Sequence, residues 1–103
     1  MLNNVIMVGR IASDLVLETK NNRKEIILTL AIQRNIKDEN GNGIIDFIPC
    51  KLYDQLAETT IQHCQKHNVV GIKGKIQSNE DKSIIVVAER ITFLSSNSNH
   101  ETN

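Results

Sequence analysis

The sequence predicts a small all-β domain that contains one helix. Ile, Leu and Val supply most of its apolar residues, whereas only 3% of the residues are aromatic, and aliphatic β-branched cores favour strands. Apolar and polar residues alternate with period two in several short segments, and helical spacing recurs in only one. With 103 residues, of which 40% are hydrophobic, the chain can bury one modest core.

The first two strands are expected at residues 4–12 and 25–33. The first is apolar on both faces, apart from Gly9 and Arg10, so we expect it to provide a subunit contact. A polar tip at residues 20–24 predicts a hairpin turn before the second strand, which alternates cleanly. The turn-forming sequence RNIKDENGNG predicts a loop over residues 34–43.

The third strand, residues 44–53, separates its side chains by parity. One face is expected in the core and carries Ile44, Ile48, Cys50 and Leu52, with Asp46 as an exception. The opposite face carries Ile45, Phe47, Pro49, Lys51 and Tyr53. Alternate residues of a strand point to opposite sides, so the two rings are expected on the outer face with a lysine between them.

The remaining elements follow from the same rules. Asp54 is expected as the N-cap of a helix over residues 54–66, whose buried side runs from Leu56 to Cys64. Two more strands are expected at residues 69–77 and 83–94, joined by a tight turn at residues 79–82. Three strands, a helix and two strands are the layout of an OB-fold, a five-stranded Greek-key barrel with the helix between strands 3 and 4. This pattern alone leaves other small all-β folds open.

We therefore expect an OB-fold domain over residues 1–94 and a disordered polar tail over residues 95–103. Basic and acidic residues balance at 12 each, so nucleic-acid binding would depend on where the charges lie. No stretch is long enough to span a membrane, and the N-terminus lacks the basic start of a signal peptide. We expect a cytoplasmic protein, with Cys50 and Cys64 as reduced, buried thiols.

The outer face of residues 44–53 carries the chemistry that binds single strands, because bases stack on rings and lysines neutralise phosphates. Phe47 and Tyr53 are the predicted stacking residues; the alternative, that they pack in the core, conflicts with the core face already assigned. Pro49 raises a second alternative, since a bulge there would shift parity and separate the rings. The predicted phosphate contacts are Lys51, Lys73 and Lys75, followed by Arg34 and Arg10.

Other chemistry finds little support in the sequence. No Ser/His/Asp arrangement or supported carboxylate pair is present, so we expect no enzyme and no cofactor. His63, Cys64 and His67 lie close together but lack further ligands at useful spacing, so we expect no metal site. Gly41 and Gly43 fit turns and not a phosphate-binding loop. Surface basic residues can also be merely solvated, and Arg10 can instead pair with a carboxylate.

Five segments, in order, resemble the family of bacterial single-stranded DNA-binding proteins. They are MLNNVIMVGRI at the N-terminus, LTLAI at residues 28–32, DFIPC with LY and LAE at residues 46–58, GIKGKI at residues 71–76, and VVAE with FL at residues 86–94. The resemblance covers about residues 1–94. It implies an OB-fold that binds single-stranded DNA with little sequence preference in replication, recombination and repair. It also implies homo-oligomers, dimers or tetramers, and base stacking on Phe47 and Tyr53.

The sequence departs from that family pattern in three places. Ile36 occupies a third stacking position, and the fourth lies in a longer hairpin that residues 79–82 have largely lost. The end of the chain, SSNSNHETN, lacks the acidic, hydrophobic tip that recruits partners, which fits either a short form or a fragment. Two alternatives remain: a primosomal-type accessory factor that bridges DNA and a replication protein, and a structural OB subunit that contacts protein only.

Overall fold

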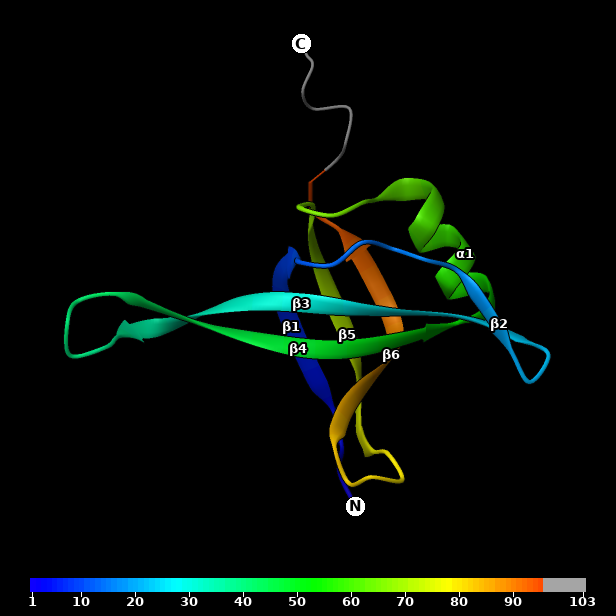
Figure 1. Ribbon diagram of the computed structural model, residues 1–103, viewed down its shortest axis with the longest axis horizontal. Helices are drawn as coiled ribbons and strands as arrows, with labels where there is room; N and C mark the ends of the chain where they lie inside the picture. The colour runs from blue at the N-terminus through cyan, green and yellow to red at the C-terminus, as the bar shows by residue number, and fades with distance from the viewer. Residues whose placement is uncertain (96–103) are drawn as a thin grey trace, which may run out of the picture.

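The computed structural model describes residues 1–95 and shows a closed barrel with one helix at its side (Figure 1). Five strands close the barrel in the order β1-β5-β6-β4-β3, and pairing between β1 and β3 completes the ring. The elements are β1 Val5–Ile11, β2 Glu18–Lys20, β3 Arg23–Lys37, β4 Gly43–Tyr53, α1 Asp54–His63, β5 Val69–Ser78 and β6 Ile84–Phe93. The predicted OB-fold, with its helix between the third and fourth barrel strands, is confirmed. Residues 96–103, which make up most of the predicted tail, lie outside the described residues.

Aliphatic side chains from every barrel strand and from α1 fill the interior. Ile26, Leu28 and Leu30 of β3 face Cys50 and Leu52 of β4, and all five are fully buried. The remaining buried members of the core are Ile11, Ala57, Cys64, Val70, Ile72, Val86 and Ala88. The core face predicted for β4 is therefore confirmed at Ile48, Cys50 and Leu52. Ile44, also predicted on that face, is only half-buried and lies outside the core.

Barrel closure requires a glycine at Gly9 of β1. A Cβ atom there would lie 2.6 Å from the carbonyl oxygen of Ala31 and 2.9 Å from the Leu30 side chain. Arg10 and Ile11 pair directly with Ala31 and Leu30, so β1 and β3 are in close contact at this point. A side chain at Gly9 would force the two closing strands apart.

The strand β3 is longer than predicted, because Arg34–Lys37 continue it where we expected a loop. With β4 it forms a long hairpin arm that reaches well beyond the barrel, on the left in Figure 1. The arm ends in a turn held by Asp38, whose Oδ1 accepts hydrogen bonds from the backbone N–H groups of Asn40 and Asn42 at 2.9 and 2.8 Å. The turn is thus confined to residues 38–42, because Lys37 pairs with Gly43 immediately before and after it.

The chain between β1 and β3 contains the short strand β2, where we had predicted only a linker and a turn. It pairs with the start of β3 from Glu18↔Glu25 to Lys20↔Arg23. The turn itself occupies Asn21 and Asn22, both with left-handed φ values of 51° and 65°, a conformation that asparagine tolerates well.

The helix begins at Asp54 as predicted, but its predicted N-cap and its predicted end at residue 66 were wrong. Tyr53 occupies the N-cap position without a side-chain cap, and Asp54 has a φ of 52°. The Asp54 carboxylate instead accepts two hydrogen bonds from Arg23. At the other end α1 stops at His63, because Asn68 Oδ1 accepts the N–H of Gln65 at 2.9 Å and turns the chain towards β5. Within residues 1–95 no helix has the length and apolarity required to cross a bilayer.

Candidate nucleic-acid interface

The outer face of β4 is continuous from one aromatic ring to the other. The pairing of β3 with β4 runs in unbroken register from Ile45↔Gln33 to Tyr53↔Glu25, with Pro49 opposite Thr29. The Thr29 N–H donates to Ser13 Oγ at 2.9 Å, and its carbonyl oxygen accepts the Ala12 N–H at 2.8 Å. The backbone N–H and carbonyl groups of Thr29 therefore point away from Pro49. Because no hydrogen bond is formed between these two residues, the missing N–H of proline removes none from the pairing of β3 with β4. Pro49 makes no bulge, and the predicted sharing of one face by the two rings is confirmed.

Phe47 presents an open ring. Its side chain is 61% exposed, although phenylalanine is usually buried. Its partner across the sheet is Ala31, which in turn pairs with Arg10 of β1. Because directly opposed residues share a face, a row from Arg10 through the small Ala31 to Phe47 crosses three strands. An exposed ring beside a small neighbour is accessible to a flat ligand.

Tyr53, at the other end of this face, is half-buried and has charged neighbours. The guanidinium carbon of Arg23 lies 3.8 Å from the ring centroid, and Lys51 Nζ lies 5.8 Å from it. The residue directly opposite on β3 is the buried Glu25. No sequence pattern marks Arg23 as a neighbour of Tyr53, because residues 20–24 have the composition of a turn and only the strand register brings Arg23 to the ring.

A row of outward-facing residues joins Lys51 to Lys75. Lys51 of β4 pairs with Val87 of β6, and Val87 pairs with Lys75 of β5. Lys73 lies two residues before Lys75 on the same face, opposite the exposed Ile6 of β1. The three lysines predicted as phosphate contacts thus share a surface with the outer face of β4.

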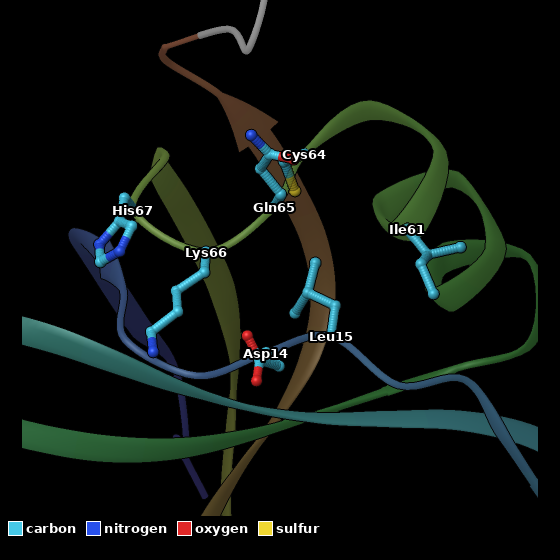
Figure 2. A pocket seen from close by; sticks show the side chains of 7 residues that line it. All are labelled: Asp14, Leu15, Ile61, Cys64, Gln65, Lys66 and His67. Atoms are coloured by element: carbon cyan, nitrogen blue, oxygen red, sulfur yellow. The ribbon is translucent and has the colours of Figure 1, made fainter.

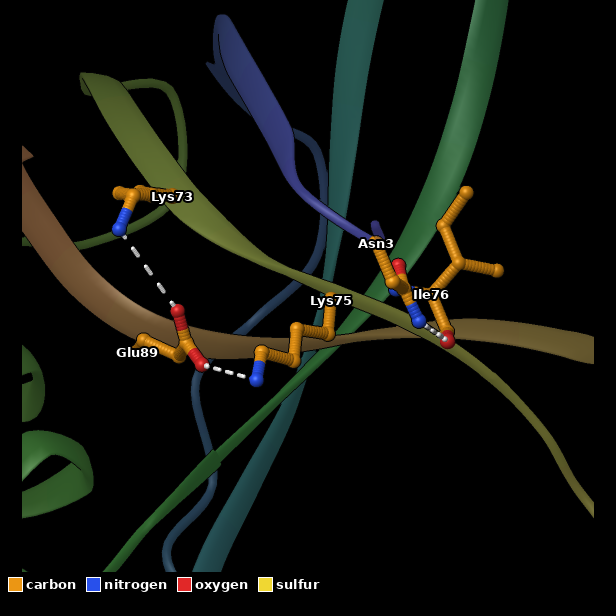
Figure 3. Close-up of polar contacts among 5 residues, drawn as sticks. All are labelled: Asn3, Lys73, Lys75, Ile76 and Glu89. Carbon is orange, nitrogen blue, oxygen red and sulfur yellow. Dashed lines mark hydrogen bonds and ion pairs between the residues drawn. The ribbon is translucent and has the colours of Figure 1, made fainter. Parts of the chain in front are cut away.

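Glu89 stands between two of these lysines. The register of β5 with β6 passes from Lys73↔Arg90 to Gly74↔Ala88, so Glu89 is the extra residue of a β-bulge. Its carboxylate lies 3.9 Å from Lys73 Nζ and 3.5 Å from Lys75 Nζ. Figure 3 shows Glu89 between the two lysines, with both ion pairs as dashed lines. The charges of both lysines are partly compensated before any ligand arrives.

The side chain of Asn3, which lies just before β1 in the chain, links the N-terminal segment to β5. Its Nδ2 donates to the carbonyl oxygen of Ile76 at 2.8 Å, and its Oδ1 accepts the Ile76 N–H at 2.9 Å (Figure 3). The side-chain amide therefore acts as an additional pair in the ladder between the N-terminal segment and β5. This pair fixes the strand that carries Lys73 and Lys75.

Arg34 and Asp46 form a bidentate ion pair on the arm. Arg34 Nε and Nη2 donate to the two carboxylate oxygens, both at 2.9 Å. This guanidinium lowers the pKa of the Asp46 carboxyl below its usual value, and Asp46 raises the pKa of Arg34. Asp46 alternates with Ile45 and Phe47 along β4, so the pair lies on the opposite face of the arm from Phe47. Asp46 was the one polar residue on the predicted core face of β4. It can lie there because the arm extends past the core at this point.

Arg10 is also held, although not by a carboxylate. Its Nη1 donates to the backbone carbonyl oxygen of His67 at 2.7 Å. The guanidinium keeps its full charge, because a carbonyl group is neutral. Arg10 thus remains a cation in the row that leads to Phe47.

The remaining reactive groups are engaged or buried. Cys50 and Cys64 are free thiols, and burial raises their pKa to about 12 and about 11. The ring of His63 stacks on Phe93 with centroids 5.6 Å apart. Within residues 1–95, no group of three or more His, Cys, Asp or Glu residues could hold a metal ion.

An open pocket of about 510 Å³ lies between the end of α1 and the linker that follows β1 (Figure 2). Its lining residues are Asp14, Leu15, Ile61, Cys64, Gln65, Lys66 and His67. None of the seven predicted DNA-binding residues lines it. The pocket is therefore separate from the candidate interface.

A five-stranded barrel whose outer face presents rings and cations defines an OB-fold domain of the kind that binds oligonucleotides. Comparison with known proteins agrees. The model of the "Single-strand binding protein family" matches residues 2–94. Single-stranded DNA-binding protein 3 of Streptococcus agalactiae is 37% identical over 113 aligned residues, which cover 100% of this chain and 82% of the relative. This chain belongs to the single-strand binding protein family.

Another relative agrees with this assignment, and two solved structures share the fold. Single-stranded DNA-binding protein B of Bacillus subtilis is 35% identical over 94 residues, covering 86% of this chain and 83% of the relative. The single-stranded DNA-binding protein of Thermus aquaticus superposes with a TM-score of 0.76 at 21% identity, over 91% of this chain and 50% of that one. The dimeric N-terminal domain of PriB from Thermoanaerobacter tencongensis gives 0.71 at 21% identity, over 90% and 97% of the two chains. At these identities the structural matches support the fold alone.

Proposed function

We propose that this protein binds single-stranded DNA with little sequence preference, through base stacking on the outer face of β4. The observation that carries the proposal is the unbroken register that places Phe47, Lys51 and Tyr53 on one face. Stacking tolerates any base, because every base has a π-face, and each stacked base contributes about 1–3 kcal/mol. Sequence relatives named as single-stranded DNA-binding proteins support the same function.

Phosphate neutralisation is assigned chiefly to Lys51, Lys73 and Lys75. Lys51 and Lys75 flank Val87 on the outer surface, so a strand that stacks on β4 can pass its backbone over β6 towards β5. Arg10 contributes from the row that includes Phe47. Arg34 contributes less, because Asp46 already binds its guanidinium on the opposite face of the arm.

Homo-oligomer formation is part of the proposal. On β1 the outward side chains Ile6 and Val8 are 78% and 57% exposed, and a second copy can cover this apolar strip. Assembly into a dimer or tetramer would join several modest DNA-binding faces into one tighter binder. In solution, Ile6→Asp together with Val8→Asp should reduce the assembly to monomers, as measured by light scattering.

The cellular role proposed is that of a non-enzymatic binding protein in cytoplasmic DNA replication, recombination and repair, with replication proteins as further partners. A primosomal-type accessory role is not favoured. The PriB domain matches at 21% identity, whereas the relatives at 35–37% identity are named single-stranded DNA-binding proteins. A role limited to contact with protein is also not favoured, because these relatives are named for binding single-stranded DNA.

Fluorescence anisotropy with labelled oligo-dT and a matching duplex tests the proposal. We expect the single strand to bind more tightly, with affinity that falls as salt rises. Phe47→Ala combined with Tyr53→Ala should abolish binding and preserve the fold, whereas Val16→Ala, at an exposed apolar residue elsewhere, should have no effect. Equal, weak binding of oligo-dT and duplex at low salt would refute the function, and a double variant within twofold of the parent would refute the stacking assignment.

A further inference from the structure

Tyr53 is held on one side by a residue to which neither the resemblance nor the sequence pattern pointed. Arg23, the first residue of β3, places its guanidinium carbon 3.8 Å from the centroid of the Tyr53 ring. That distance is van der Waals contact for two flat groups, so no base fits between them. One of the two faces of the ring is therefore occupied before DNA binds.

Asp54 fixes the guanidinium in that position. Its Oδ2 accepts hydrogen bonds from Arg23 Nε at 3.1 Å and Nη2 at 2.8 Å. Asp54 directly follows Tyr53 and has a φ of 52°, in the left-handed region. Arg23 thus contacts two consecutive residues at the junction of β4 and α1, through the ring of one and the carboxylate of the next.

Neighbouring ion pairs fasten the same hairpin. Lys24 Nζ lies 3.3 Å from Glu58 of α1, and Lys20 Nζ lies 3.7 Å from Glu25. The exposed Lys24–Glu58 pair is weak alone, but it joins β3 to α1, and the pair of Lys20 with the buried Glu25 joins β2 to β3. The hairpin keeps Arg23 over Tyr53, and no comparable cation lies over Phe47 among the described residues.

We propose that Arg23 is a positioning residue of the DNA-binding surface, which clamps Tyr53 so that the ring offers one face to one base. The inference rests on the proposed single-strand binding. The clamp removes the cost of fixing the ring when a base arrives, because an unrestrained side chain loses rotamer freedom on binding. Arg23 acts through Tyr53 and not as a separate phosphate contact.

Intrinsic fluorescence gives a direct readout, because Tyr53 is the only tyrosine and the chain has no tryptophan. Without DNA, Arg23→Ala should make Tyr53 more accessible to acrylamide quenching, and Arg23→Lys should give an intermediate result. Asp54→Asn should resemble Arg23→Lys, because the guanidinium stays but loses its ionic partner. Circular dichroism should show the wild-type fold for all three, since Arg23 and Asp54 are about half exposed.

Oligo-dT binding then tests the coupling. Arg23→Ala should weaken binding about threefold, the size expected for one exposed cation–π contact. In a Tyr53→Ala background the same change should have no effect, whereas in a Phe47→Ala background it should still cost about threefold. This pattern would establish that Arg23 acts through Tyr53.

Several results would overturn the clamp. Unchanged acrylamide quenching in Arg23→Ala would show that the ring is not held. An equal loss of affinity in the Tyr53→Ala background would make Arg23 a direct DNA contact, and tighter binding by Arg23→Ala would make it a shield. If wild-type protein fails to bind oligo-dT, the proposed function fails, and with it the role in DNA binding; the DNA-free quenching still decides whether Arg23 holds the ring.

Discussion

The two rings of β4 lie on one face of one strand, yet their surroundings differ. Phe47 stands at the start of the arm, 61% exposed, opposite Ala31. Tyr53 lies at the junction with α1 and is half-buried. Arg23 covers one face of its ring, and Glu25 is its paired residue on β3. The strand decides which way a side chain points, but the neighbouring strands decide how much of it a ligand can reach. We therefore describe the interface as an open end at Phe47 and a clamped end at Tyr53.

The largest expected effect comes from breaking the barrel beneath the open end. Gly9→Ala places a Cβ atom 2.6 Å from the carbonyl oxygen of Ala31, the residue opposite Phe47, and overpacking of this kind costs about 1–3 kcal/mol. We expect thermal unfolding at a temperature lower by roughly 5–15 °C. Gly41→Ala, at the tip of the arm where nothing lies within 4 Å, is the control for a distant glycine, although its positive φ of 82° carries its own modest strain.

An unchanged melting temperature in Gly9→Ala would mean that β1 and β3 can separate without cost. The open end would then not depend on barrel closure. Oligo-dT binding by the variant, measured below its melting temperature, would show whether the position of Phe47 had moved.

Removing the rings one at a time compares the two ends directly. Phe47→Ala should weaken oligo-dT binding by about tenfold or more, the range expected for one stacked base. Tyr53→Ala should cost less, because one face of that ring is already covered by Arg23. Anisotropy titrations at one salt concentration measure both losses, and a larger loss for Tyr53→Ala would reverse our ranking of the two ends.

The two lysines of β5 that face Glu89 should affect both ends of the interface alike. Glu89 lies 3.5 Å from Lys75 and 3.9 Å from Lys73, so it competes with phosphate for them. Glu89→Gln should tighten oligo-dT binding by about two- to threefold at low salt, and the gain should fade as salt rises. Glu80→Gln, at an exposed residue of the turn between β5 and β6, controls for net charge, and an equal gain there would show a general charge effect.

The smallest effect is expected from the Arg34–Asp46 ion pair, which lies on the face of the arm opposite Phe47. Arg34 lowers the pKa of Asp46 below its ordinary value of 3.8, so Asp46 stabilises the fold above about pH 4 and loses this contribution as pH falls through its lowered pKa. Asp46→Asn should reduce the midpoint of urea unfolding slightly at pH 7, and this difference from the wild type should shrink as the pH falls below about 4. Glu39→Gln, at an exposed residue of the same arm, is the matched control.

A larger destabilisation by Asp46→Asn at low pH than at neutral pH would contradict the sign of this shift. The same variant frees Arg34 from its carboxylate. If oligo-dT binding then tightens, Arg34 is a phosphate contact that Asp46 normally competes for.

Local sequence patterns predicted most of this fold and the shared face of the two aromatic rings. Period-two alternation assigned the core face of β4 correctly from Ile48 to Leu52, because a buried face requires apolar residues at every second position. It failed at Ile44, which lies on the arm beyond the core. It also placed Phe47 and Tyr53 together. Whether Pro49 separates them could not be read from the sequence, since the answer lies in the backbone partners of Thr29.

The missed features all depend on partners far away in sequence. Arg23 reaches Tyr53 only through the pairing of β3 with β4. Asp54 does not cap the helix as predicted, and its carboxylate binds Arg23 instead. The strand β3 continues as far as Lys37 because Lys37 pairs with Gly43 of β4 after a register shift, and the bulge at Glu89 arises from the pairing of β5 with β6. Sequence patterns predict on which side of a strand a residue lies. The residues that contact each aromatic ring are decided by the register between strands.

Whether bases and not only phosphates hold the strand is the central question for this interface. The most direct measurement compares the affinity of the wild-type protein for oligo-dT with that for an abasic oligomer of equal length and charge, at the same salt concentration. Stacking on Phe47 and Tyr53 predicts that the abasic oligomer binds at least tenfold more weakly, about the contribution of one stacked base. Equal affinity for the two oligomers would contradict the account and reduce the outer face of β4 to an electrostatic surface.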